Sequence, residues 1–292
     1  MNGHSYCYPN IGRSGLGNCL LVWARAFVCA QQRGFGMLAP QWVQPRVGAL
    51  LRREPVTRFY TAEFTNCGYV GGWRKWWILR RGERISESEL SAAPSASSNS
   101  NNRIRVIEFA GLGDYFTGLI AYKQSIYSEL KRISSSQALV AAETATSPFI
   151  AVNVRRGDLT RQKKIPLNEI LQYTPDEWFM AAIKALRARA PWSTMPIKVI
   201  SDGSRNELQK ILSLPNCELV TTGKAVGDIL LMARARLLVA TGYSTFSMWA
   251  SFLGEMHTLY AHGKMQQKLF RPQAKAFEGE WDASRPLPDV IS

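Results

Sequence analysis

The amino-acid sequence predicts an α/β fold with a parallel sheet, because apolar segments of strand length alternate with helical patterns through its second half. Three of these segments, 149–158, 197–202 and 237–246, run from apolar residues into polar ones. In an open α/β sheet, ligands bind beyond the carboxyl ends of the strands. We therefore expect the three polar ends to meet at one crevice.

The first predicted element is a buried helix that follows a glycine-rich turn at residues 12–18. Apolar side chains recur there at helical spacing until a glycine ends the pattern. These residues are Leu20, Trp23, Ala24, Phe27 and Val28, followed by Gly34. The N-terminus of this helix is expected to open on a flexible loop.

The rest of the first half contains a low-complexity segment, 91–102, that is rich in serine and asparagine. Such a composition cannot bury apolar surface, so an exposed loop is predicted. A short strand at 105–109 and a helix around 120–130 follow. Residues 134–147, rich in Ser, Ala and Thr, lie at the predicted boundary between two domains, 1–136 and 137–292.

Two helices of the second half have clear sequence signals. Residues 174–177 read Thr-Pro-Asp-Glu, which is typical of a capping box with proline at the first helical position. The inward stripe of this helix is predicted to be Phe179, Ala182, Ile183 and Leu186. A second helix is expected to begin near Ser244 and to end at Gly254.

Composition restricts the class of protein. The chain has 292 residues, 46% of them hydrophobic, which suffices for two α/β domains with separate cores. Its 36 Lys and Arg against 22 Asp and Glu give a net charge of +14, which favours nucleotides, nucleic acid or an anionic membrane as partners. Charge alone does not choose among these three.

Five scattered cysteines without a Cys-x-x-Cys pair predict neither a disulfide framework nor a zinc site, and they fit a reducing compartment. The sequence begins without a secretory signal and contains no apolar run of membrane-spanning length. A cytoplasmic protein is expected.

Within the first of the three segments, Arg155 and Arg156 directly follow the apolar strand, and Gly157 and Asp158 come next. A surface ion pair is the ordinary role of such arginines. Two adjacent guanidiniums repel each other unless an anion lies between them, and guanidinium binds phosphate oxygens as a fork. Asp158 is expected to orient these guanidiniums.

The other two strand ends carry Asp202, and Ser244 with Thr245 at the start of a helix. Asp202 has the alternative role of capping a turn, and Ser244 that of an ordinary helix N-cap. Gly242 is expected to let the backbone approach a ligand closely. Together these groups suit a nucleoside diphosphate, with phosphates at the helix N-terminus and a carboxylate on the nucleoside.

Several other chemistries lack their motifs in this sequence. The glycine pattern of a hydrolase nucleophile elbow is incomplete at 242–246, and no P-loop motif occurs. Only three histidines and no Asp-x-Asp are present. We therefore expect no metal and no cofactor, with cationic side chains taking the place of a metal on the diphosphate.

Taken in order and spacing, seven sequence blocks resemble the α-1,2-fucosyltransferases of glycosyltransferase family 11, and more distantly core α-1,6- and protein O-fucosyltransferases. The blocks are 15–18, 113–116, 152–158, 178–184, 199–202, 228–232 and 244–250. The resemblance implies a GT-B fold, in which two Rossmann-like domains face each other across a cleft. It also implies an inverting, metal-independent transfer of L-fucose from GDP-fucose to a glycan hydroxyl, α-1,2 to galactose in a surface polysaccharide or oligosaccharide.

The resemblance also implies roles for individual residues. The C-terminal domain would hold GDP-fucose, and the N-terminal domain would bind the acceptor. The implied donor-binding residues are Gly17, Asn18, Asn153, Arg155, Arg156, Asp202, Ser244, Thr245 and Phe246. Within this set Arg155 would bind the β-phosphate. In the transfer mechanism that we expect, Arg155 is catalytic, and Asp158, outside this set, is a second candidate, as general base. The family has histidine where this chain has Asn153, which bears on the guanosine contact and the choice of donor.

Two other interpretations stay open. The run Trp73-Arg-Lys-Trp-Trp77 and the net charge favour a nucleic-acid-binding protein, although tryptophans at helical spacing are predicted to be core and no nucleic acid is expected. Asn153 suggests a lapsed transferase that still binds GDP or glycan. Trp42, Phe59, Tyr60 and the loop near Ser91 are candidate acceptor contacts. Peripheral contact with an anionic membrane, at the inner membrane, is a further expectation.

Overall fold

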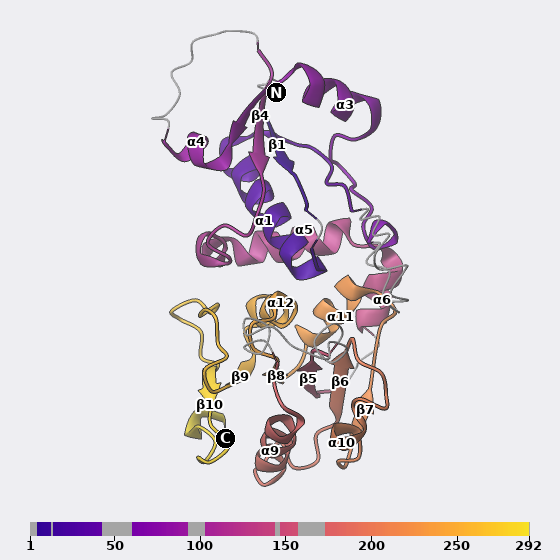
Figure 1. Cartoon of the computed structure of the whole chain (residues 1–292), viewed down its shortest axis with the longest axis vertical. Helices are drawn as coiled ribbons and strands as arrows, with labels where there is room; N and C mark the ends of the chain where they lie inside the picture. The colour runs from indigo at the N-terminus through magenta and orange to yellow at the C-terminus, as the bar shows by residue number, and fades with distance from the viewer. Residues whose placement is uncertain are drawn as a thin grey trace. The chain divides into compact units, whose positions relative to one another are not determined.

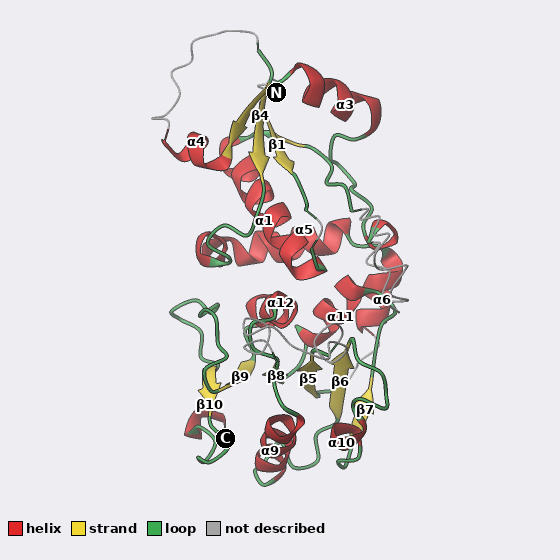
Figure 2. Ribbon diagram, in the orientation of Figure 1, coloured by secondary structure: helices red, strands yellow, loops and turns green. Residues whose placement is uncertain are grey.

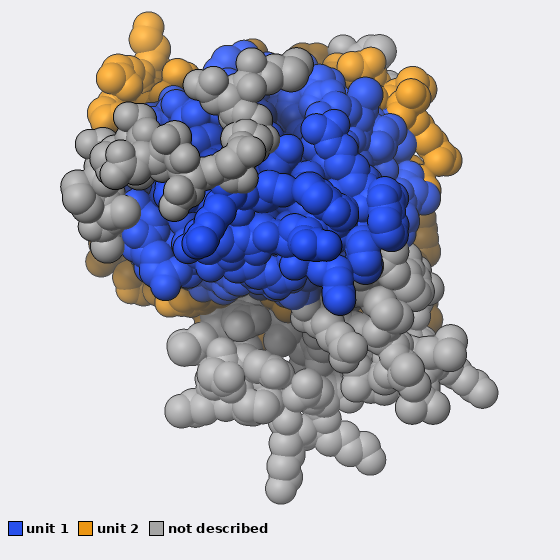
Figure 3. All heavy atoms as spheres, turned by 90° about the horizontal axis from the view of Figure 1, so that it is seen from above, with its two compact units in different colours: residues 1–135 blue, residues 136–292 orange. Residues whose placement is uncertain are grey.

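The computed structural model describes residues 5–12, 14–42, 60–92, 103–143, 147–156 and 173–291. Its helices and strands are labelled in Figure 1 and coloured by type in Figure 2. The chain forms two compact units, Met1–Ser135 and Ser136–Ser292, which Figure 3 colours separately. This division lies one residue from the predicted boundary, and the roles assigned to the two domains stay predictions.

The first unit contains a parallel sheet with the strand order β2-β1-β4-β3. Its strands are β1 (Ser5–Pro9), β2 (Gly36–Met37), β3 (Glu83–Ser86) and β4 (Arg105–Phe109). Its helices are α1 (Leu16–Arg33), η1 (Thr61–Glu63), α3 (Gly72–Arg81), α4 (Glu87–Ala92), η2 (Thr117–Tyr122) and α5 (Lys123–Ile133). The predicted strand at 105–109 is confirmed, and the helix expected around 120–130 begins as a 3₁₀ turn and continues as α5.

Helix α1 confirms the predicted buried helix. Most of its residues are buried, including Leu20 and Trp23, which are fully inaccessible. Gly34 ends it in the left-handed region at φ 65°, and the Gly34 N–H donates to the carbonyl of Ala30. This conformation favours glycine because a Cβ would be strained there. Residues 93–102 of the predicted loop lie outside the described part of the chain.

Helix α3 contradicts the prediction that its tryptophans are core. Trp73, Trp76 and Trp77 are 73%, 49% and 44% exposed, and Ile78 is the buried residue of this helix. Helical spacing identifies one face of a helix, but it does not say which face the rest of the fold covers.

The second unit contains a parallel sheet with the strand order β10-β9-β8-β5-β6-β7. Its strands are β5 (Ile150–Val154), β6 (Ile197–Ser201), β7 (Cys217–Leu219), β8 (Leu237–Ala240), β9 (His257–Ala261) and β10 (Glu278–Trp281). Its helices are α6 (Ser136–Glu143), α9 (Asp176–Arg187), α10 (Gln209–Leu212), α11 (Ala225–Met232), α12 (Thr245–Gly254) and η3 (Asp289–Ile291).

The order of strands in this sheet creates a switch point between β5 and β8. From β5 the chain proceeds to β6 and β7 on one side, and then to β8, β9 and β10 on the other. Helices α9 and α10 lie on one side of the sheet, and α6, α11 and α12 lie on the other (Figure 2). Ligands of open α/β sheets bind outside the carboxyl ends of the strands at such a point.

Helix α9 covers the core of the second unit. Its predicted stripe, Phe179, Ala182, Ile183 and Leu186, is buried against Ile150, Val152 and Val154 of β5 and against neighbouring strands. The predicted capping box is wrong. Pro175 occupies the N-cap position and has no hydroxyl to cap the helix, and the buried Thr174 Oγ1 makes no hydrogen bond within the described structure.

Candidate functional site

The three strand ends predicted to meet do lie side by side, because β6, β5 and β8 are consecutive in the sheet. Hydrogen bonds join them. The Arg155 N–H donates to Thr241 Oγ1 over 3.0 Å, and Thr241 Oγ1 donates to the carbonyl of Asn153 over 2.7 Å. On the other side, the Arg156 N–H donates to Asp202 Oδ1 over 2.7 Å. The predicted convergence is confirmed, and Thr241 is a member that sequence reasoning missed.

Arg155 has a fixed backbone and an uncommitted side chain. Its N–H is bound by Thr241, and its carbonyl accepts a hydrogen bond of 3.1 Å from Arg156 Nη1. The residue is half-buried, and no described residue hydrogen-bonds or ion-pairs with its guanidinium. A guanidinium is always charged and has five donors. It can therefore bind an anion beside the switch point.

Arg156 lies elsewhere than expected. Its side chain is buried, forms an ion pair with Asp176, and donates to the carbonyl of Thr174 over 3.1 Å. The guanidinium also lies 5.0 Å from the ring centroid of Tyr173 and 5.8 Å from that of Phe179. These contacts correct the expectation that both guanidiniums face an anionic ligand, because a protein carboxylate is the partner here.

Asp202 links the ends of two neighbouring strands. One carboxylate oxygen, Oδ1, accepts the Arg156 N–H, while the residue as a whole is exposed. The next residue, Gly203, packs closely against Arg156, since a Cβ at position 203 would lie 3.0 Å from Arg156 Cβ. Asp202 therefore fastens the end of β6 to that of β5, and its nucleoside contact stays a prediction.

The N-terminus of α12 lies at the end of β8. Ser244 is buried at the N-cap position without a side-chain capping bond, and Thr245 and Phe246 are half-buried. Ser247 Oγ donates to the carbonyl of Thr241 over 2.9 Å, which ties the helix to the strand end. The first turn has no acidic residue, so the partial positive charge of the helix terminus is available to an anion.

Gly242 packs closely against another part of the same unit, and its approach to a ligand stays a prediction. A Cβ at this position would lie 2.2 Å from Lys264 Cβ and 2.5 Å from the Lys264 carbonyl oxygen. The Tyr243 N–H donates to that same carbonyl over 3.2 Å. Burial lowers the pKa of Lys264 from its usual value. This lysine is a second cationic residue near α12, and no motif in the sequence predicts it.

Asn153 contains a buried polar atom that lacks a partner. The residue is 4% exposed, and Nδ2 donates to the carbonyl of Ile200 over 3.2 Å. Its Oδ1 accepts no hydrogen bond within the described structure. Buried side-chain acceptors usually have partners, so this atom suits a ligand N–H. Asn153 is the penultimate residue of β5, and Arg155 directly follows the strand.

The remaining predicted residues are divided between the first unit and the undescribed part of the chain. Gly17 is buried and Asn18 is half-buried in the first turn of α1, where Gly15 caps without a side chain. Their donor contacts stay predictions. Asp158 lies outside the described residues, as does Phe59.

Trp42 and Tyr60 do not match the expectation of acceptor contacts, because both are core residues. Trp42 is 2% exposed, stacks on Phe64 with a centroid distance of 3.9 Å, and donates from Nε1 to Asn66 Oδ1 over 2.8 Å. Tyr60 is 5% exposed.

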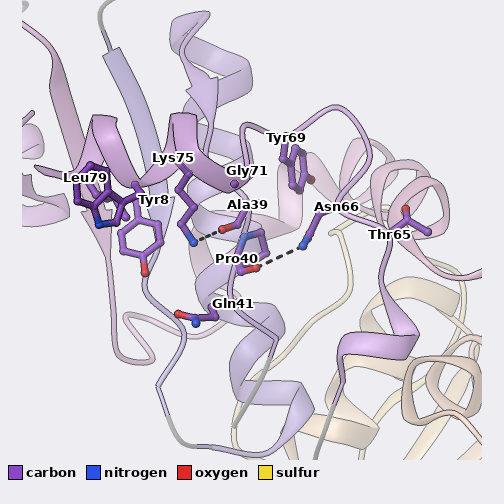
Figure 4. A pocket seen from close by; sticks show the side chains of 12 residues that line it. Tyr8, Ala39, Pro40, Gln41, Thr65, Asn66, Tyr69, Gly71, Lys75 and Leu79 are labelled. Carbon is purple, nitrogen blue, oxygen red and sulfur yellow. Dashed lines mark hydrogen bonds between the residues drawn. The ribbon is translucent and has the colours of Figure 1, made fainter. Parts of the chain in front are cut away.

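The first unit has a groove of about 610 Å³ at the carboxyl ends of β1 and β2 (Figure 4). Lys75 points into it, where Nζ donates to the Ala39 carbonyl over 2.7 Å and lies 4.9 Å from the ring centroid of Tyr8. Burial lowers the pKa of Lys75 and raises that of Tyr8. The lining is Tyr8, Ala39, Pro40, Gln41, Thr65, Asn66, Tyr69, Gly71, Gly72, Lys75, Trp76 and Leu79. The groove thus combines aromatic rings with side-chain amides and a lysine, which suits a ligand that has both polar groups and apolar faces.

Two α/β units, each with a parallel sheet, together with a cationic strand end beside a helix N-terminus, define the GT-B class of glycosyltransferases. The model of the family described as Glycosyl transferase family 11 matches residues 123–285, more than half of the chain. The chain therefore belongs to glycosyl transferase family 11. This confirms the resemblance found in the sequence.

Solved structures of the fucosyltransferase NodZ share the fold. The fucosyltransferase NodZ from Bradyrhizobium has a TM-score of 0.52 at 16% identity, over 87% of this chain and 94% of its own. NodZ α-1,6-fucosyltransferase soaked with GDP-fucose has a TM-score of 0.50 at 18% identity, over 86% and 93%. POFUT1 in complex with GDP has a TM-score of 0.48 at 14% identity, over 89% and 98%. No curated protein sequence matches the chain.

Proposed function

We propose that this glycosyltransferase moves L-fucose from GDP-fucose to a glycan hydroxyl, α-1,2 to galactose. The family supports the transfer of a sugar, and NodZ was studied with GDP-fucose. The observation that carries the proposal is the guanidinium of Arg155 at the β5–β8 switch point, which no described residue hydrogen-bonds or ion-pairs, next to the N-terminus of α12, whose first turn contains no acidic residue. A diphosphate bound there would meet two sources of positive charge.

In this mechanism the bond between fucose C1 and the β-phosphate oxygen breaks, and its electron pair stays on the phosphate. Arg155 and the N-terminus of α12 stabilise that negative charge as it develops, which is usually the largest catalytic contribution. The acceptor hydroxyl attacks C1 from the opposite face, so the anomeric centre inverts. It loses its proton to a general base, for which Asp158 is the candidate. Cationic side chains take the place of a divalent metal on the diphosphate.

Titration of the purified protein with nucleotides tests the donor. Calorimetry in the presence of EDTA should detect GDP and GDP-fucose, while UDP and ADP should bind at least about tenfold more weakly, since each lost base contact leaves buried polar groups unpaired. Equal affinity for all nucleotides, or binding that requires Mg²⁺ or Mn²⁺, would contradict the proposal. Salt-dependent binding of single-stranded nucleic acid that GDP does not affect would favour a nucleic-acid-binding protein. GDP binding without turnover on β-galactosides would indicate a lapsed transferase.

Asn153 provides a test of nucleoside recognition. Because its buried Oδ1 has no described protein partner, we propose that it accepts an N–H of the guanosine. Asn153→Ala should then weaken GDP binding about tenfold, the effect of one hydrogen bond to a desolvated group. Pyrophosphate binding should change little. Asn206→Ala, at an exposed position of the same unit, is the matched control. Equal losses for GDP and pyrophosphate would show that the residue acts only by shaping the strand end.

A further inference from the structure

Helix α3 exposes tryptophans that the first unit does not use. Trp73, Trp76 and Trp77 are 73%, 49% and 44% exposed, whereas Ile78 attaches the helix to the core. Single exposed apolar residues are common on protein surfaces, but a contiguous group of large ones marks an interaction site. We call the three rings the tryptophan cluster.

The tryptophan cluster is an ordered surface. The rings of Trp73 and Trp76 stack with a centroid distance of 4.5 Å and an angle of 21°. The Arg80 guanidinium lies 5.7 Å from the centroid of the Trp76 ring. These contacts hold the indoles against one another and against a cation, so little side-chain freedom remains to be lost when a partner covers them.

The charged residues of helix α3 itself are all positive. Helix α3 reads Gly-Trp-Arg-Lys-Trp-Trp-Ile-Leu-Arg-Arg and contains no acidic residue. Lys75 points into the groove, but Arg74, Arg80 and Arg81 are all exposed. The whole chain has a net charge of +14. A partner of this surface must therefore offer negative charge together with an apolar layer.

We propose that α3 is a membrane-contact helix that lies in the headgroup region of an anionic lipid bilayer. Tryptophan prefers the boundary between headgroups and acyl chains, and arginines close to an anionic surface each add attraction. Short amphipathic helices with basic and aromatic residues bind in this manner without spanning the bilayer. Among the described residues, no helix is long and apolar enough to span one.

Two other partners fit less well. Single-stranded nucleic acid needs free ring faces for base stacking, but faces of Trp73 and Trp76 are occupied by each other and by Arg80. A symmetric dimer through α3 would set arginines against arginines, because an isologous interface pairs a surface with itself. A bilayer bound by α3 would also lie close to the groove, because Trp76 is one of the groove's lining residues. A lipid-linked glycan could then enter the groove from the membrane surface.

Vesicle binding by the full chain tests the proposal independently of the transfer reaction. We expect co-sedimentation with vesicles of phosphatidylcholine and phosphatidylglycerol, and little with phosphatidylcholine alone. The pair Trp73→Ala and Trp77→Ala should reduce partitioning at least about tenfold, because interfacial burial of both rings is lost. Trp76 is left unchanged because it lines the groove. Arg80→Gln with Arg81→Gln should reduce binding to the anionic vesicles only.

Matched controls separate this surface from general charge and apolar exposure. The controls are Val140→Ala and Arg205→Gln, both at exposed positions of the second unit, where Val140 is 64% exposed. Both variants are expected to bind vesicles as the wild type does. Unchanged vesicle binding by the Trp73/Trp77 variant with a native circular dichroism spectrum would overturn the proposal. The proposal would also be overturned if the protein did not bind vesicles but bound an oligonucleotide, or formed a dimer, in a manner that depends on Trp73.

Discussion

Replacing Arg155 by alanine is expected to lower turnover by about a hundredfold or more, because removal of one stabilising donor from a transition state has effects of this size. The structure supports a selective effect. The main-chain contacts of Arg155 with Thr241 and Arg156 do not involve its own side chain, so they persist in the variant. The unfolding midpoint should therefore change little while transfer from GDP-fucose falls.

Arg155→Lys is the informative companion to this variant. Lysine retains the charge but not the planar fork of the guanidinium, so this variant should recover part of the turnover lost in Arg155→Ala, but not all of it. Single-turnover rates at saturating donor and acceptor measure the chemical step, and GDP affinity measures ground-state binding separately. Near-normal turnover by Arg155→Ala would remove the residue from the mechanism.

The sequence predicts the frame of the site well because the frame depends on local signals. Runs of apolar residues at 150–154, 197–201 and 237–240 become adjacent strands, since fully buried parallel strands need little beyond such runs. The polar residues that follow them then meet at the carboxyl ends. This inference requires only the direction of the strands.

The parts of the site that could not be predicted depend on partners distant in sequence. Arg156 was expected to face an anionic ligand, but its partner Asp176 lies 20 residues further along, at the start of α9. Gly242 was expected to approach a ligand, but it packs on Lys264. In each case the residue type was interpreted correctly as needing an anion or close approach. The identity of the partner is a tertiary property.

The same reasoning applies to the tryptophans. Trp23 and Trp73 both belong to helical patterns of apolar residues, yet Trp23 is fully buried and Trp73 is 73% exposed. Helix α1 packs on β1 and β4, whereas α3 touches the core through Ile78. Periodicity in a sequence therefore locates a surface of a helix, and the contacts of the rest of the fold decide whether that surface is core or is left for a partner.

The ion pair between Arg156 and Asp176 leads to the largest expected effect on stability. The side chains are 2% and 16% exposed, so Asp176→Ala would leave a buried guanidinium without its counter-charge. Breaking a buried pair in this way costs about 3–5 kcal/mol of unfolding free energy. Denaturant unfolding of the full chain, followed by circular dichroism, measures it. The variant should also lose turnover, because Arg156 fixes the backbone carbonyl of Arg155.

The neighbouring residue offers a matched control. Glu177 pairs with Lys210 over 3.1 Å, but these side chains are 72% and 65% exposed, so Glu177→Ala should have no measurable effect. Replacing both members of the buried pair, with Met at 156 and Leu at 176, should recover much of the loss, because no uncompensated charge remains. If Asp176→Ala unfolds at the same denaturant concentration as Glu177→Ala, then the ion pair does not hold the end of β5, and the position of Arg155 must have another cause.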